Sequence, residues 1–135
     1  MKQEDLLEAH VQVKRMSNLL VEVEDLSRQM AEAVDRNDQV TVRMLLSMRQ
    51  TPIDNLKIAE QTLRQKIASF EVTEDAQRLA ALLNGSAPQE DAEASLAAQV
   101  AANARLYNKV IALDKAINRK IAGEKSVYQA KQGAE

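Results

Sequence analysis

The sequence predicts an all-α protein, and three features of its composition and patterning lead to that fold class. The chain of 135 residues holds only 3 Gly and 2 Pro, whereas an all-β fold needs turn residues about every ten positions. Aromatic residues make up 2% although 45% of the chain is hydrophobic, so the apolar residues are mainly aliphatic. Apolar residues recur every three or four positions over long stretches. We expect an elongated antiparallel helical bundle of two long helices, a kinked middle helix and one short helix.

The first helix is expected from about Gln3 to Arg36, a stretch without Gly or Pro. Its apolar residues form two rows with a seven-residue repeat, and a third row widens the stripe. A stripe of this width is typical of a helix packed in a bundle. The rows hold Leu6, Val13, Leu20 and Val34, then Met16, Val23 and Met30, and finally Leu19, Leu26 and Ala33.

The second helix is expected over residues 38–70, with an interruption at Pro52. Asn37 tolerates the left-handed conformation that ends a helix, and Asp38 is a good N-cap for the next one. A proline inside a helix costs about 3 kcal/mol, and Thr51-Pro52-Ile53-Asp54 also fits the pattern of a new helix start. We therefore predict a kink or a one-residue break in an otherwise collinear helix.

A short third helix and a long last helix complete the predicted bundle. Thr73 is the expected cap of the short helix, and Asn84-Gly85 the expected end. The last helix is expected to begin near Pro88 and to reach residue 125 or 128, with Gly123 as a weak point. We assign residues 1–128 to one helical-bundle domain and residues 129–135 to a flexible C-terminal tail.

The residue types that carry most chemistry are scarce. The sequence has no Cys and a single His, His10, whose neighbours lack metal-ligand spacing. It also has no phosphate-binding glycine loop and no nucleophile elbow. These features argue against an enzyme, and we expect no cofactor and no metal.

Charge and hydropathy limit the partners and the location. The net charge is -2, with basic residues scattered among acids, so we expect no nucleic-acid binding. The apolar runs are too short to span a membrane, and the chain does not start with a secretory signal. We expect a cytoplasmic protein without membrane insertion.

Two features leave alternatives open. Asn103 lies on the apolar stripe of the last helix, where it either fixes the register of packing or marks a part of the helix that meets a partner. Met16, Met30, Met44 and Met48 either fill gaps in the core or line a surface that accepts another helix.

Several segments follow one another in an order that is typical of a known protein family. The segment Val34-Asp35-Arg36-Asn37-Asp38-Gln39-Val40 precedes Leu45-Leu46-Ser47-Met48-Arg49-Gln50 and then Ile53-Asp54-Asn55-Leu56. The last helix is rich in Asn and Leu, with Asn103, Asn108 and Leu113, and closes at Val127-Tyr128. Over most of its length the chain thus resembles the FlgN/FliT group of flagellar type III export chaperones. It departs from that pattern at Pro52 and at Asn37, where a turn glycine is expected.

The resemblance implies a cytoplasmic, non-enzymatic chaperone that binds a helical client. The client would be the helical C-terminal segment of a hook-associated or filament-cap protein, delivered to the export apparatus. By analogy the client surface lies on the apolar face of the last helix, and Tyr128 contacts a component of the export gate. The implied partner-binding residues are Leu106, Val110, Leu113, Ile117, Ile121 and Tyr128.

Two other hypotheses remain. In the first, the chain is a non-enzymatic helical-bundle interaction module without a flagellar role. A second copy then covers the apolar stripe in a homodimer or larger homo-oligomer. In the second it is a nucleic-acid-binding or transcription-factor-binding adaptor, for which mild net acidity argues against direct nucleic-acid contact and leaves protein contact.

Overall fold

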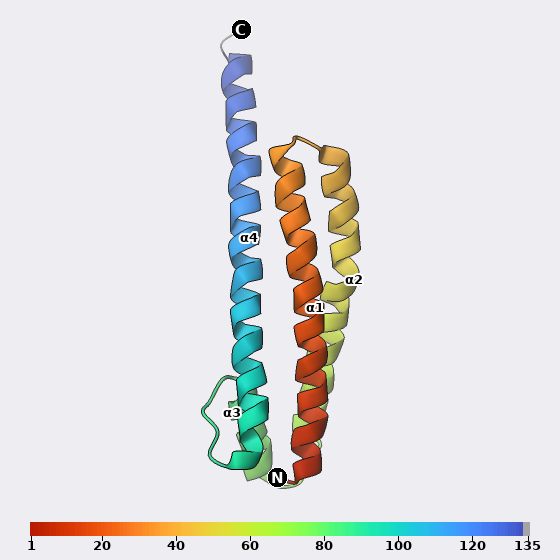
Figure 1. Ribbon diagram of the computed structural model, residues 1–135, viewed down its shortest axis with the longest axis vertical. Coiled ribbons are helices and arrows are strands. Elements are labelled where there is room, and N and C mark those ends of the chain that lie inside the picture. Colours follow the sequence, from red (N-terminus) through yellow and green to blue (C-terminus); the bar gives the residue numbers. More distant parts are fainter. Residues whose placement is uncertain (134–135) are drawn as a thin grey trace.

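The computed structural model describes the backbone of residues 1–133 and the side chains of residues 1–123. Its elements are α1 (Gln3–Asp35), α2 (Gln39–Ala68), α3 (Thr73–Leu83), a 3₁₀ turn η1 (Asp91–Glu93) and α4 (Ala94–Gly133). Three long helices run side by side, and α3 lies across the end that holds the N-terminus (Figure 1). The all-α helical bundle predicted from the sequence is confirmed.

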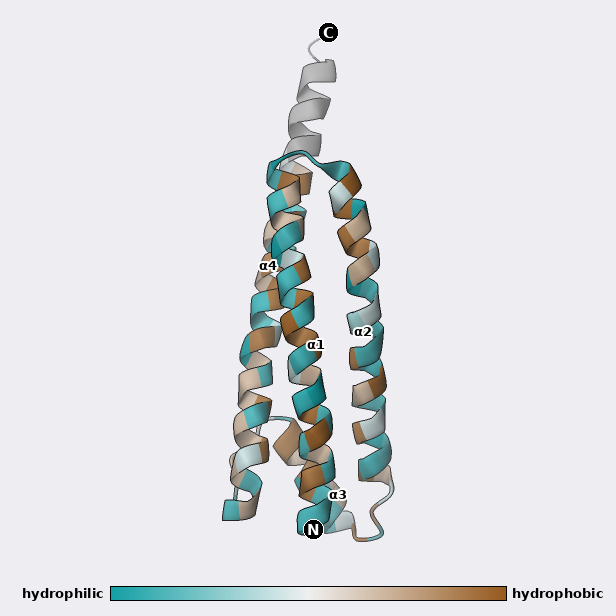
Figure 2. Ribbon diagram, turned by 45° about the vertical axis from the view of Figure 1, so that its right-hand side comes forward, coloured by the Kyte–Doolittle hydropathy of each residue, from teal (hydrophilic) through white to brown (hydrophobic). Residues whose placement is uncertain are grey.

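Helix α1 is the centre of the bundle. It packs along α2 on one side and along α4 on the other, whereas α2 and α4 barely approach each other. Figure 2 shows hydrophobic residues recurring along α1 where it lies between the other two helices. The apolar rows predicted for the first helix supply this contact, since Leu6, Val13, Leu20, Val23, Leu26, Met30, Ala33 and Val34 are buried.

The core consists of two clusters at opposite ends of α1. The cluster near the N-terminus joins α1 to α2, α3 and the start of α4 through Leu6, Ala9, Val13, Leu63, Leu79, Leu82 and Leu96. The cluster near the α1–α2 turn joins α1, α2 and α4 through Leu26, Met30, Val34, Leu45 and Ile117. Full burial of an aliphatic side chain contributes about 1.5–3 kcal/mol, so these clusters dominate the stability of the bundle.

The α1–α2 turn forms as predicted. Asn37 has a φ of 56°, in the left-handed region that asparagine tolerates better than most residues. The carboxylate of Asp38 then caps α2 by accepting a hydrogen bond from the Thr41 backbone N–H at 3.1 Å. Bonding to the Thr41 hydroxyl and backbone N–H lowers the pKa of Asp38.

Helix α2 is continuous across Pro52, so of the predicted kink or one-residue break the break does not occur. The helix runs unbroken from Gln39 to Ala68, so Thr51 does not cap a new helix. Asp54 instead accepts a hydrogen bond from Gln50 Nε2 at 2.7 Å. The Pro52 ring is fully buried, and Leu45 and Ala59, one heptad to either side, are buried with it. Packing of this face therefore offsets the loss of one backbone hydrogen bond.

Two helix starts differ from the prediction, while one predicted end is confirmed. Thr73 is the first residue of α3 and not its cap, because Val72 takes that position without a side-chain hydrogen bond. The helix ends at Asn84 and Gly85, whose φ of 97° suits glycine. Helix α4 begins only at Ala94, because the expected first turn is a loop followed by η1. It then continues past Gly123 to Gly133.

Candidate functional site

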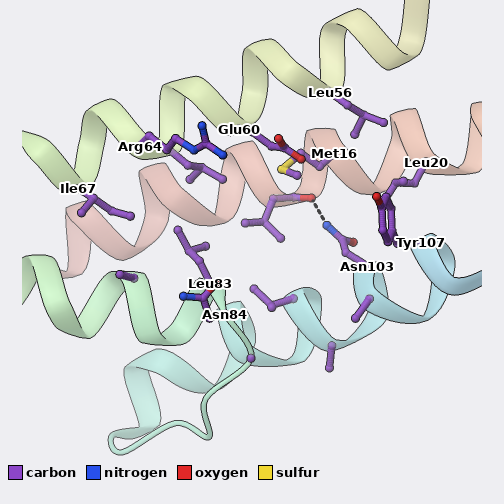
Figure 3. Close-up of a pocket in the computed structure, with 17 residues that line it drawn as sticks. Met16, Leu20, Leu56, Glu60, Arg64, Ile67, Leu83, Asn84, Asn103 and Tyr107 are labelled. Atoms are coloured by element: carbon purple, nitrogen blue, oxygen red, sulfur yellow. Dashed lines mark hydrogen bonds between the residues drawn. The ribbon is translucent and has the colours of Figure 1, made fainter. Parts of the chain in front are cut away.

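An apolar groove lies between α2 and α4, with α1 as its floor. We call it the α2–α4 groove; its volume is about 780 Å³. Val13, Met16 and Leu20 of α1 form the floor, and Leu56, Glu60, Leu63, Arg64 and Ile67 of α2 form one wall. The opposite wall is Val100, Ala101, Asn103, Ala104 and Tyr107 of α4, and Ala80, Leu83, Asn84 and Gly85 line it at the α3 end. Figure 3 shows these side chains converging from the separate helices.

The groove exists because α2 and α4 both pack on α1 but not on each other. The eleven-residue step from Leu56 to Ile67 on the α2 wall corresponds to about 17 Å of helix, or roughly three turns. Met16 is only half-buried at its floor, and Tyr107 is 56% exposed at its wall. Three long helices thus leave an apolar surface of helical length that is open to solvent.

At one end of the groove, an ion pair fixes the loop between α3 and α4. Arg78 on α3 donates from Nη2 to Glu93 Oε1 at 2.6 Å and from Nε to Oε2 at 3.0 Å. The Gln89 backbone N–H also donates to Glu93, and Arg78 donates to the Ala87 carbonyl oxygen. The Arg78 hydrogen bonds, supported by the Gln89 N–H, lower the pKa of Glu93 to about 2. This pairing draws Glu93 into η1 and explains why α4 starts later than predicted.

Beyond the other end of the groove, one side chain joins all three long helices. Arg49 on α2 donates to Asp114 Oδ1 on α4 at 2.5 Å and to Ser27 Oγ on α1 at 3.1 Å. The Ser27 hydroxyl itself donates to the Val23 carbonyl oxygen at 2.7 Å. The Arg49 side chain is only 15% exposed, so its charge is largely removed from water and relies on this contact. Arg49 therefore sets the distance between α2 and α4 where they would otherwise separate.

Asn103 is buried and has hydrogen-bond partners for its side-chain amide. Its Nδ2 donates to the Val13 carbonyl oxygen on α1 at 2.8 Å, drawn as a dashed line in Figure 3. Its Oδ1 accepts from Gln99 Nε2 at 3.1 Å. Of the two alternatives for Asn103, the structure supports the fixing of register between α4 and α1.

The partner-binding residues implied by the resemblance lie mainly on the side of α4 that packs on α1. Val110 and Ile117 are 8% and 4% exposed, and Leu106, Leu113 and Ile121 are half-buried. Ile117 belongs to the core cluster near the α1–α2 turn, and Ile121 packs against that cluster. Tyr128 falls outside the side chains that the structure describes. Within the described residues, the open apolar side of α4 is the neighbouring one that bears Val100 and Tyr107.

The four methionines divide between the two alternatives. Met30 is buried in the core, while Met16 lies at the floor of the groove. Met44 and Met48 are more than half exposed on α2, outside the groove lining. Val40 and Ile58 are also exposed and lie on the same side of α2, and we call these four residues the outer strip.

Several residues of this site have no direct signal in the sequence. Glu60 and Arg64 look like ordinary surface charges of an amphipathic helix, and Arg49 pairs with a residue 65 positions away. Tyr107 follows Asn103 by four positions on the apolar stripe of α4, but the stripe alone does not reveal which of its residues face a neighbouring helix. The groove could be found from the sequence only with knowledge of how α1 packs, because only then is it clear which apolar residues of α2 and α4 remain uncovered.

Metal-ligand groups and membrane-spanning helices are both absent from the described residues. They contain no group of three or more His, Asp or Glu residues that could hold a metal ion, and His10 is half-buried on α1. Among them there is also no helix with the length and apolar character needed to cross a membrane.

Comparison of the chain with protein-family models, with curated proteins and with solved structures finds no match in any of the three.

Proposed function

We propose that this protein is a helix-binding chaperone whose α2–α4 groove holds an amphipathic helix of a client protein. The groove is the observation that supports the proposal, since it exposes aliphatic side chains from three helices along about three helical turns. A fourth helix laid between α2 and α4 would bury these side chains and its own apolar face, as in helix-in-groove recognition. The chain would act without catalysis by keeping an aggregation-prone segment covered until it is released.

The resemblance to the FlgN/FliT group supports a more specific form of this proposal. The client is then the helical C-terminal segment of a hook-associated or filament-cap protein, and the chaperone delivers it to the flagellar export apparatus in the cytoplasm. The leucine pair that contributes to the resemblance divides between two environments: Leu45 lies in the core and Leu46 is exposed. Arg49, from the same segment, maintains the separation of α2 and α4.

The docking surface that we propose is adjacent to the residues implied by the resemblance. Val110 and Ile117 hold α4 on α1, so a client that contacted them directly would have to displace α1. A client in the groove instead contacts Val100, Ala104 and Tyr107 on the neighbouring side of α4. Charged substitutions at Ile117 would therefore unfold the bundle rather than test binding.

Binding is tested with a labelled peptide of about 18 residues that has a leucine face and glutamine on both edges. Fluorescence anisotropy should show saturable binding to the wild type. Ala104→Glu places a carboxylate on the groove wall, so docking would bury an unpaired charge and weaken binding by about tenfold or more. Ala112→Glu is the matched control, because Ala112 is also exposed on α4 but lies outside the groove lining. Equal binding by both variants would contradict the proposed site.

The flagellar role is tested separately, by deleting the gene in the native host and measuring secretion of hook-associated and filament-cap proteins. Loss of their secretion, restored by the wild-type protein and not by Ala104→Glu, is the expected result. Normal secretion in the deletion strain would contradict the flagellar role even if the groove binds helical peptides.

A homo-oligomeric interaction module is the second candidate, and the outer strip is the observation in its favour. Val40, Met44 and Met48 follow at four-residue steps on α2 and are 76%, 55% and 51% exposed, as a surface for a second copy would be. Light scattering over a concentration series separates the two candidates. A monomer with an open groove favours the chaperone, and a stable dimer that no longer binds the peptide favours the module.

A further inference from the structure

The two walls of the α2–α4 groove differ in charge. Glu60 and Arg64, both on α2, are the only charged residues among those that line it. The α4 wall offers Val100, Ala101, Asn103, Ala104 and Tyr107, none of which is an acidic or basic residue. Figure 3 shows Glu60 and Arg64 together on α2, facing the groove from the side opposite Tyr107. Any charge selection by the groove therefore comes from its α2 edge.

Basic residues continue along this edge beyond Arg64. Lys57 precedes Arg64 by seven residues, which is about two helical turns and returns to nearly the same face of α2. Arg43 occupies the same heptad position at the far end of the helix, with Gln50 between them. All four side chains are exposed. The α2 edge thus carries a row of cations spaced in multiples of about 10.5 Å.

These cations have no acidic partner among the side chains that the structure describes. None of the ion pairs within the described residues involves Arg43, Lys57 or Arg64. Glu60 lies four residues before Arg64 but forms no ion pair with it within the same part of the chain. Asp54, on the side of the row away from the lining residues, accepts its hydrogen bond from Gln50. The positive charge along the groove edge is therefore available to a partner.

We infer that the α2–α4 groove selects an amphipathic helix with one acidic edge, which lies along α2 with acidic residues seven positions apart opposite Lys57 and Arg64. The inference rests on the proposed function, because it assumes that the groove binds a helix. The other edge of the partner meets Ala101 and Ala104, whose small side chains admit a close approach without a charge requirement. Charge complementarity of this kind contributes specificity and faster association more than affinity.

The test uses three synthetic peptides of about 18 residues with the same leucine face. One edge carries Glu, Gln or Lys at seven-residue spacing, and the other edge is Gln in all three. Exposed ion pairs contribute little to affinity, so two attractive pairs against two repulsive ones should make the Glu peptide bind about tenfold tighter than the Lys peptide at low salt. At about 0.5 M salt the difference should fall below about twofold, because exposed charges are screened.

A double variant tests the residues themselves. Lys57→Gln with Arg64→Gln should bring the affinity for the Glu peptide close to that for the Gln peptide. Arg105→Gln with Lys109→Gln is the control, since it changes the net charge equally at exposed positions of α4 outside the groove lining. This control should retain the preference.

The outcomes separate this inference from the function on which it rests. If all three peptides bind equally well, or the Lys peptide binds best, the charge selection is wrong and helix binding stands. A preference that the control double variant also abolishes would likewise overturn the assignment to Lys57 and Arg64. If no peptide binds, helix binding in the groove fails, and the charge selection with it.

Discussion

Two isoleucines six residues apart on α4 provide a matched test of how this helix is oriented. Ile117 is 4% exposed within the core cluster near the α1–α2 turn, whereas Ile111 is 36% exposed on α4. Truncation of a buried isoleucine to alanine removes apolar contacts and leaves a cavity, at a cost of 2–5 kcal/mol in well-packed cores. We expect Ile117→Ala to lower the free energy of unfolding by about 3 kcal/mol and Ile111→Ala by about 1 kcal/mol or less.

The assay is urea unfolding followed by far-UV circular dichroism, with thermal unfolding as a second measurement. For a domain of this size, 1 kcal/mol corresponds to roughly 3–5 °C in Tm, so the two variants should differ by roughly 6–10 °C. Both substitutions raise helix propensity by the same amount, so their difference reports packing alone. If Ile111→Ala costs as much as Ile117→Ala, α4 is rotated relative to α1. The assignment of Tyr107 to an open groove wall would then be wrong.

Three further predictions concern contacts that shape the bundle. In a double-mutant cycle followed by urea unfolding, Arg49→Met and Asp114→Asn should show a coupling free energy of about 1 kcal/mol. A coupling free energy near zero would mean that this contact does not hold α2 to α4. The pKa of Glu93 is lowered to about 2 from 4.5, so its ion pair stabilises the fold above about pH 4.5 and loses that effect as the pH falls towards 2. Glu93→Gln should therefore cost up to about 3 kcal/mol at pH 7 and little at pH 2, and a pH-independent cost would contradict this linkage. Pro52→Ala should raise the free energy of unfolding by about 1–2 kcal/mol, because α2 already passes through this position without a break and the substitution removes only the packing of the ring. A lower free energy of unfolding would show that the packing of the ring contributes more than the missing backbone hydrogen bond costs.

Local features of the fold follow from the sequence because they depend on neighbouring residues. The heptad rows of α1 predict its buried face, since the period of the helix alone decides which residues share a side. Asn37 and Asp38 predict the α1–α2 turn from backbone preference and side-chain capping. Gly85 predicts the end of α3 for the same kind of reason.

Features that depend on the packing of distant segments were not predicted. Pro52 reads as a helix break from its own chemistry, but burial of its ring keeps α2 continuous. The start of α4 shifts because Glu93 pairs with Arg78 on α3. The groove is the clearest case, since it results from two helices that pack on a third and barely approach each other, and no single helix pattern contains that information.

Photo-cross-linking can show directly whether an amphipathic helix occupies the α2–α4 groove. A leucine-faced peptide with one photoactivatable residue on its apolar side is irradiated with the protein, and the joined fragments are mapped by mass spectrometry. We expect cross-links to Met16, Leu56 and Tyr107, which lie on three different helices around the groove. Cross-links confined to Met44 and Met48 of the outer strip would contradict this expectation.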